Sequence, residues 1–185
     1  MRWRRLFDDL EAQFDAAEAA ELAAEVSDRT RLEMSLLRTV DRLAGSRGRA
    51  LTFTVQGAGA VKGTLLAAAP EWLLLEEPPA REVLVRAGAV LTVSGLGPRS
   101  GVPGAEGEVG RRLGLASALR GLSRDRTPVT VDLVDGARLS GTIDRVGQDY
   151  LELAEHHAGE PRRPAAVSGV RLLPFAALAL LRAAG

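Results

Sequence analysis

The feature that most constrains the fold of this chain is an internal repeat with an offset of 78 residues. The triplet Gly63-Thr64-Leu65 returns as Gly141-Thr142-Ile143, and apolar residues on both sides return at the same offset without a gap. The equivalent pairs are Leu51 and Val129, Phe53 and Val131, Val55 and Leu133, Val61 and Leu139, Trp72 and Tyr150, Leu73 and Leu151, and Leu75 and Leu153. The sequence therefore predicts one structural unit that occurs twice.

Each copy has the alternation of apolar and polar residues that is typical of half-buried strands, as in Leu51 to Val55. Strands of about five to seven residues are too short for a flat sheet with a useful core, so they favour closure into a small barrel. Gly63 and Gly141 lie among the inward-facing positions, where a missing side chain lets a strand bend sharply.

Helices are predicted before each set of strands. Apolar residues recur at helical spacing from Trp3 to about Val26, and Ser27 or Asp28 is a candidate N-cap for a second helix that ends near Gly45. The two helices are expected to form a hairpin. The segment "RRLGLASALRGLSRD" predicts a further short helix before the second set of strands.

The predicted fold class is α+β, with an N-terminal helical hairpin followed by two tandem five-stranded barrels of the Sm-like or SH3-like type, each preceded by a helix. The expected boundaries are 1–46 for the N-terminal helices, 47–97 for the first barrel, 98–110 for a linker, 111–125 for the connecting helix and 126–185 for the second barrel with a C-terminal tail. The linker is assigned from its Gly and Pro content.

The segment "LVDGARLSGTIDRVGQDYLEL" (residues 133–153) resembles the first motif of Sm-like proteins, with Asp135-Gly136 at the turn and then Leu139, Gly141 and Ile143. "AAVSGVRLLPF" (residues 165–175) is similar to their second motif. The resemblance implies a small barrel led by a helix, pairing of strand edges between subunits, and association with RNA. Gly147 and Ala69 stand where the family usually has an aspartate.

The opening "MRWRRLFDDLEAQ" and the segment "ALRGLSRDRTPV" also resemble an uncharacterised family of GC-rich bacteria that is sometimes labelled as Fis-type regulators. No helix-turn-helix pattern supports that label.

Composition limits the partners and the compartment. Lys and Arg number 24, as do Asp and Glu, so no global field draws the chain to nucleic acid or to lipid. There is no cysteine, no signal-peptide pattern and no apolar run long enough to cross a bilayer. We expect a cytoplasmic protein that makes no membrane contact.

Catalytic motifs are not recognisable. "SGLGPRSG" lacks the spacing and the following helix of a dinucleotide loop, and the adjacent His156 and His157 would point in opposite directions on a strand end. No nucleophile elbow or phosphate-binding loop is present. We therefore predict a non-catalytic protein with no cofactor and no metal.

One function hypothesis is RNA association. Arginine pairs with phosphate and stacks on bases, and an aromatic ring offers a second stacking face. Acidic residues, among them Asp132, Asp144 and Glu152, lie between the candidates and would repel a phosphate backbone. The candidate residues are Arg111, Arg112, Arg120, Arg124 and Arg126 on the connecting helix, and Arg138, Arg145, Tyr150, Arg162 and Arg163 on the second barrel.

The other hypothesis is a protein-interaction or scaffold protein that uses barrel edges and the N-terminal amphipathic helix, with a protein partner or with self-association. Leu66 and Leu74 take outward positions where the second copy has Asp144 and Glu152, so the first copy should present an apolar surface that needs covering. The candidate interface residues are Trp3, Phe7, Leu10, Phe14, Leu66 and Leu74. The neutral charge and the residues at 69 and 147 favour this hypothesis, whereas the resemblance to Sm-like proteins favours RNA association, so both hypotheses stay open.

Overall fold

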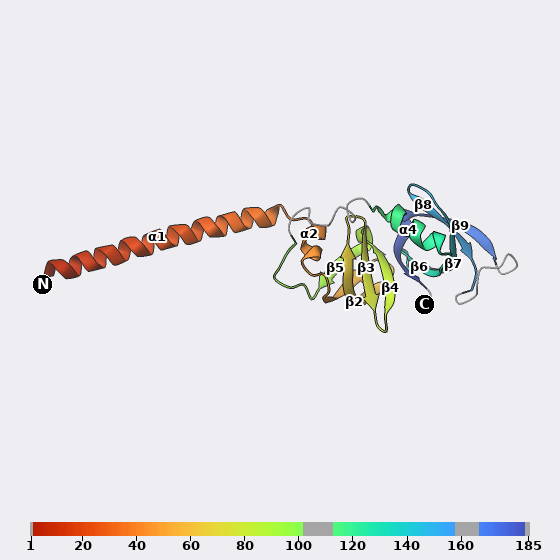
Figure 1. The fold of residues 1–185 in the computed structure, drawn as a ribbon, viewed down its shortest axis with the longest axis horizontal. Helices are drawn as coiled ribbons and strands as arrows, with labels where there is room; N and C mark the ends of the chain where they lie inside the picture. The colour runs from red at the N-terminus through yellow and green to blue at the C-terminus, as the bar shows by residue number, and fades with distance from the viewer. Residues whose placement is uncertain (1, 102–112, 158–166, 184–185) are drawn as a thin grey trace. The chain divides into compact units, whose positions relative to one another are not determined.

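The computed structural model describes residues 2–101, 113–157 and 167–183 (Figure 1). The chain divides into two compact units, one ending at Arg38 and the other running from Thr39 to the C-terminus. No helix among the described residues is long and apolar enough to cross a membrane.

The first unit is a single helix, α1 (Arg2–Ser35), and not the predicted hairpin. The expected break at Ser27 and Asp28 is absent because both side chains bond along the helix to Arg31 and do not cap a new one. Thr30 likewise donates its hydroxyl to the Val26 carbonyl, four residues back. The prediction of two antiparallel N-terminal helices was therefore wrong.

The described residues of the second unit form ten strands in one sheet, and Figure 1 shows most of these strands with their labels. Short helices precede the two groups of strands. The elements are α2 (Thr39–Ala44), β1 (Ala50–Val55), β2 (Gly59–Ala68), β3 (Trp72–Glu77), β4 (Arg81–Arg86), η1 (Ala87–Ala89), β5 (Val90–Ser94), α4 (Leu115–Arg124), β6 (Pro128–Leu133), β7 (Arg138–Val146), β8 (Tyr150–Glu155), β9 (Gly169–Pro174), η3 (Phe175–Ala177) and β10 (Leu178–Ala183).

The prediction of two tandem five-stranded barrels was wrong. The strands form one open antiparallel sheet in the order β5-β1-β2-β3-β4-β10-β6-β7-β8-β9, because β4 pairs with β10. Separate barrels would leave these two strands as unpaired edges, although both carry apolar residues on both faces. Pairing them satisfies their backbone groups and buries those side chains.

The repeat is visible in the pairing of the strands. In β1 and β2 Leu51 lies opposite Gly63, and in β6 and β7 Val129 lies opposite Gly141. The bulge between β2 and β3 also recurs between β7 and β8. From β4 onward the offset becomes 88, so that β9, η3 and β10 correspond to β4, η1 and β5. We call residues 39–101 the first half of this unit and residues 113–183 the second half.

Each half has its own hydrophobic core. Residues of β1 to β5 surround the first, centred on Phe53, Leu65 and Leu75. The second core, around Ile143 and Leu153, is covered by α4. Glycine at the repeat centre permits the close packing of strands, because a Cβ at Gly63 would lie 2.8 Å from the Glu76 carbonyl oxygen and one at Gly141 would lie 2.1 Å from that of Ala154.

Candidate functional site

The two halves of the sheet are joined by the pairing of β4 with β10. Leu180, Leu181 and Arg182 of β10 lie opposite Val85, Leu84 and Val83 of β4. Side chains from this pair enter both cores: Val83, Val85 and Leu180 belong to the first, whereas Leu84 and Leu181 belong to the second. Burial on both faces makes the two halves one structural body.

Charged groups also join the halves at this junction. Arg182 of β10 donates two hydrogen bonds of 3.1 Å to the Glu77 carboxylate on β3, and a third of 2.7 Å to Oδ2 of the buried Asp132. Arg138 also binds Asp132. The hydrogen bond to Glu77 raises the pKa of the Arg182 guanidinium against the opposing effect of burial. The charges inside this junction are thus paired.

The start of α4 is tied to the first half. The Glu71 carboxylate accepts a 2.7 Å hydrogen bond from the backbone N–H of Leu115, and Nε1 of Trp72 donates to the Leu113 carbonyl at 2.7 Å. Leu74, predicted to be an exposed interface residue, is half-buried and lines a hollow with Ala118 and Leu122 of α4. Leu66 is also half-buried. The second half of the unit therefore approaches the outer face of the first.

Two sheet edges have no strand beside them among the described residues: β5 at one end and β9 at the other. By the repeat, β9 corresponds to β4 and β5 corresponds to β10. Leu172 of β9 is 55% exposed, whereas its equivalent Leu84 is only 7% exposed at the junction. Leu91 of β5 is 62% exposed, while its equivalent Ala179 is fully buried. Each free edge thus exposes an apolar residue at a position that is buried in the junction.

Sequence reasoning did not identify Leu84, Leu91, Leu172 or Arg182 as interface residues. A signal was present, because "VLV" in β4 and "LALL" in β10 are unbroken apolar runs, which are typical of strands buried on both faces.

The predicted RNA-binding arginines are not gathered into one free surface. Arg138 is held by Asp132, and Arg145 lies 3.8 Å from the Glu152 carboxylate. The hydrogen bond to Asp132 raises the pKa of Arg138. Arg120 donates to the Gly147 carbonyl at 3.4 Å. Arg111, Arg112, Arg162 and Arg163 lie outside the described residues.

Three of the predicted RNA-binding arginines line the same hollow. Arg124, Arg126 and Arg145 line a hollow between the end of α4 and β7, together with Asp144. Tyr150 does not offer a free stacking face on its Gly147 side, because a Cβ at Gly147 would lie 2.3 Å from the tyrosine ring. A side chain at position 147 would therefore collide with the Tyr150 ring.

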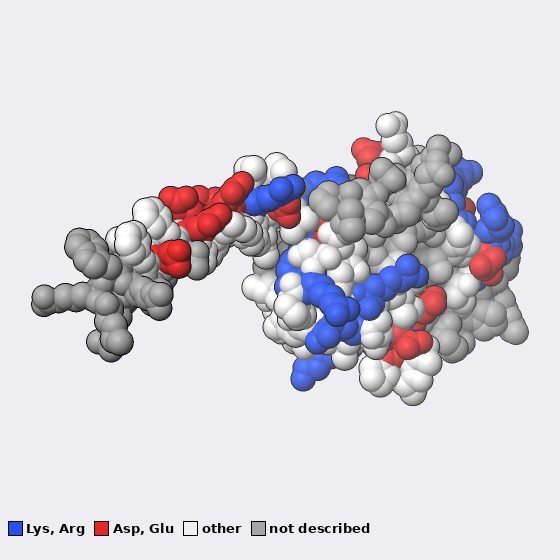
Figure 2. All heavy atoms as spheres, turned by 60° about the vertical axis from the view of Figure 1, so that its left-hand side comes forward, with Lys and Arg blue, Asp and Glu red and all other residues white. Residues whose placement is uncertain are grey.

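A second group of arginines, which the sequence analysis missed, lies around α2. The Arg42 guanidinium donates to the carbonyls of Gly97 and Arg99, and that of Arg49 lies beside Gly97. Arg47, Arg49 and Arg99 are exposed, and none pairs with a carboxylate among the described residues. Figure 2 shows Lys and Arg side chains gathered over part of one face of the protein.

The predicted interface residues of the N-terminal helix are exposed where they are described. Phe7, Leu10 and Phe14 all lie on α1 with large exposed fractions. Trp3 is in the helix, but its side chain lies outside the described part of the chain.

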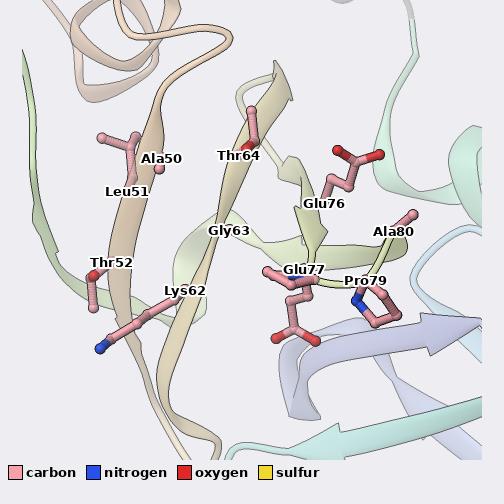
Figure 3. Close-up of a pocket in the computed structure, with 11 residues that line it drawn as sticks. Ala50, Leu51, Thr52, Lys62, Gly63, Thr64, Glu76, Glu77, Pro79 and Ala80 are labelled. Carbon is pink, nitrogen blue, oxygen red and sulfur yellow. The ribbon is translucent and has the colours of Figure 1, made fainter.

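A hollow of about 390 Å³ lies on the outer face of the first half (Figure 3). It crosses β2 at Gly63, with Thr64 and Glu76 toward one end and Lys62 and Glu77 toward the other. Leu51, Pro78 and Pro79 contribute apolar surface. Among the described residues, no group of three or more His, Asp or Glu side chains is arranged to hold a metal ion.

Comparison with protein families, curated proteins and solved structures finds no match to this chain.

Proposed function

We propose that this protein is a non-catalytic interaction protein that assembles end to end with copies of itself through β5 and β9. The observation that carries the proposal is the β4–β10 junction. The same two kinds of edge that meet inside the sheet lie at its two ends without a neighbouring strand among the described residues, and each exposes an apolar side chain. A free edge with apolar residues is a template for adding a strand.

The internal junction supplies the register of the proposed contact. Transferred by the repeat, the pairing of Leu84 with Leu181 becomes a pairing of Leu172 in one copy with Val93 in the next. Leu172 would then pack against the first core of the neighbouring copy, as Leu84 packs against the second core within the chain.

The contact between copies should be weaker than the internal junction. Ser94 takes the place of Arg182, and Glu155, the equivalent of Glu77, is already paired with Arg171. The charged bridge of the junction therefore has no counterpart at the free edges. We expect association that depends on protein concentration.

Because β5 and β9 are different surfaces, their contact is heterologous and leaves a free edge on each side of every dimer. Such contacts build rings when the rotation closes and filaments when it does not. The resemblance of residues 133–153 to the first Sm motif agrees with the proposal, since Sm-like proteins join subunits through strand edges.

A disulfide test examines the register directly, in a chain that has no cysteine of its own. Variants Val93→Cys and Leu172→Cys are mixed and oxidised, and the products are separated on a denaturing gel. The proposal predicts a covalent heterodimer in the mixture, and a ladder of oligomers when one chain carries both cysteines.

The matched control shifts the register by one residue, with Thr92→Cys mixed with Leu172→Cys. Side chains at those positions would point to opposite faces of the sheet. Equal cross-linking in the control and the test pair would contradict the proposed register, and no cross-linking in either mixture would contradict assembly through these edges.

The helix α1 is proposed as a second contact surface, for a different protein. Residues 6–28 carry eight acidic side chains and no basic one, so two such helices would repel each other. The exposed Phe7 and Phe14 therefore favour a partner with a basic and apolar groove. Changing both to glutamate should leave the assembly through β5 and β9 intact.

RNA association is a second candidate function, favoured by the shared hollow of Arg124, Arg126 and Arg145. Its test is RNA recovery from cross-linked cell extracts, comparing wild type with a variant in which Arg120, Arg124 and Arg126 are changed to glutamate. RNA at background level with the wild type would contradict this function.

A further inference from the structure

The hollow at Gly63 has a filled counterpart in the second half of the sheet. Thr64 corresponds to Thr142, and Pro78 corresponds to His156. In the second half His156 is 6% exposed, and its Nε2 lies 2.8 Å from the Thr142 hydroxyl oxygen. The repeat therefore shows the same position twice, with an imidazole near the repeated threonine in the second half and a proline in the first half.

The hydrogen bonds of His156 in the second half indicate which kind of ligand the hollow at Gly63 can bind. Nδ1 of His156 lies 3.0 Å from the carbonyl oxygen of His157, so that nitrogen donates, and Nε2 can then accept from the Thr142 hydroxyl. Ala154 lies opposite Thr142 and leaves room for the imidazole. Burial of the polar ring is compensated because both of its nitrogens have partners.

In the first half the imidazole is missing, whereas the repeated threonine and the glycine before it are kept. Pro78 supplies no hydrogen-bonding group where His156 has its imidazole, and Thr64 is half-buried at the edge of the hollow. Glu76 replaces Ala154 as the residue opposite Thr64. Figure 3 shows the Thr64 and Glu76 side chains with the hollow extending from them across Gly63.

We infer that this hollow is a binding site for an imidazole ring, with the Thr64 hydroxyl as its hydrogen-bonding partner. A hydroxyl both donates and accepts, so Thr64 can serve either protonation state of the ring. The Glu76 carboxylate favours the protonated state by charge. The volume of about 390 Å³ exceeds that of one ring, so the ring can come from a free small molecule or from a histidine of a bound peptide.

The site is separate from the proposed assembly. None of its lining residues belongs to β5 or β9, and the inference stands whether or not copies pair through those edges. It gives the two halves different roles, because only the first retains a vacant place beside the repeated threonine.

Nuclear magnetic resonance of the full chain tests the inference with two probes, imidazole and N-acetyl-histidine N-methylamide. Both should shift the backbone amide signals of Lys62, Gly63 and Thr64. A response to the blocked histidine at lower concentration than to imidazole identifies a peptide as the source of the ring, and the reverse order identifies a free small molecule. N-acetyl-phenylalanine N-methylamide, whose ring has no nitrogen, should leave these signals in place.

Three variants make the test specific. Thr64→Val should weaken binding about fivefold, as expected for the loss of one neutral hydrogen bond. Pro78→His should abolish binding by filling the hollow as His156 does, and Thr142→Val should leave it unchanged. His156→Ala should create a second site that shifts the signals of Ser140 to Thr142.

Unchanged signals at residues 62–64 with both nitrogen-containing probes would overturn the inference. Binding to Pro78→His with wild-type affinity would overturn it as well, and that result does not depend on whether His156→Ala folds.

Discussion

The repeat allows the same substitution to be made at a buried and at an exposed copy of one position. Leu84→Ala removes a side chain that is 7% exposed and packs in the second core, so we expect a loss of about 3 kcal/mol in the free energy of unfolding. Leu172→Ala acts at the equivalent position, which is 55% exposed in a single chain, and should cost about 0.5 kcal/mol or less.

Urea unfolding followed by tryptophan fluorescence measures both losses. A Trp3→Phe background leaves Trp72, which lies in the sheet, as the only tryptophan. With a slope of about 2 kcal/mol per molar urea, Leu84→Ala should lower the midpoint by roughly 1.5 M. The comparison is made at low protein concentration, where the proposed assembly dissociates. Equal losses for the two variants would refute the claim that β4 and β10 form a buried junction and that β9 is its open counterpart.

Two other substitutions test the packing of the sheet. Arg182→Met leaves Asp132 buried with Arg138 as its remaining partner and should cost about 3 kcal/mol in the same urea assay; a loss under about 0.5 kcal/mol would show that the bridge does not hold the halves together. Gly141→Ala places a Cβ 2.1 Å from the Ala154 carbonyl oxygen and should lower the free energy of unfolding by about 3 kcal/mol. Gly63→Ala places its Cβ 2.8 Å from the nearest atom and should lower the free energy of unfolding by about 1 kcal/mol. Thermal unfolding ranks the two variants, and a reversed order would contradict the strand spacing.

The buried positions of the strands followed from the sequence because the alternation of apolar and polar residues has a period of two and occurs in both copies. Val131 and Leu153, for example, are buried as their alternation predicts. The close approach of a neighbouring strand at Gly63 and Gly141 agrees with the expectation that these inward-facing positions need a missing side chain.

The single sheet was not predicted because alternation says which face a residue takes and not which strand lies beside it. The buried pairing of Leu84 with Leu181 joins residues almost a hundred positions apart. Only the unbroken apolar runs of β4 and β10 indicated burial on both faces. The helical hairpin failed for a local reason, since Ser27 and Asp28 are cap-forming residues whose side chains here bond to Arg31 within one helix.

The candidate sites were the least predictable part. Whether an arginine is free depends on which carboxylate the fold brings near it: Arg138 is bound by Asp132, while Arg49 has no carboxylate partner among the described residues. The two copies differ at the hollow, with Pro78 in the first and His156 in the second. The sequence shows this difference, but only the structure shows that His156 contacts the repeated threonine.

Sedimentation-velocity measurement of the full chain over a wide concentration range tests the central claim most directly. The account predicts species larger than one chain that grow with concentration, and their loss in Leu172→Glu. Val170→Glu is the matched control, because Val170 is also exposed on β9 and its equivalent at the internal junction, Glu82, is an exposed glutamate. A strict monomer at every concentration, or equal loss of assembly in both variants, would contradict assembly through β5 and β9.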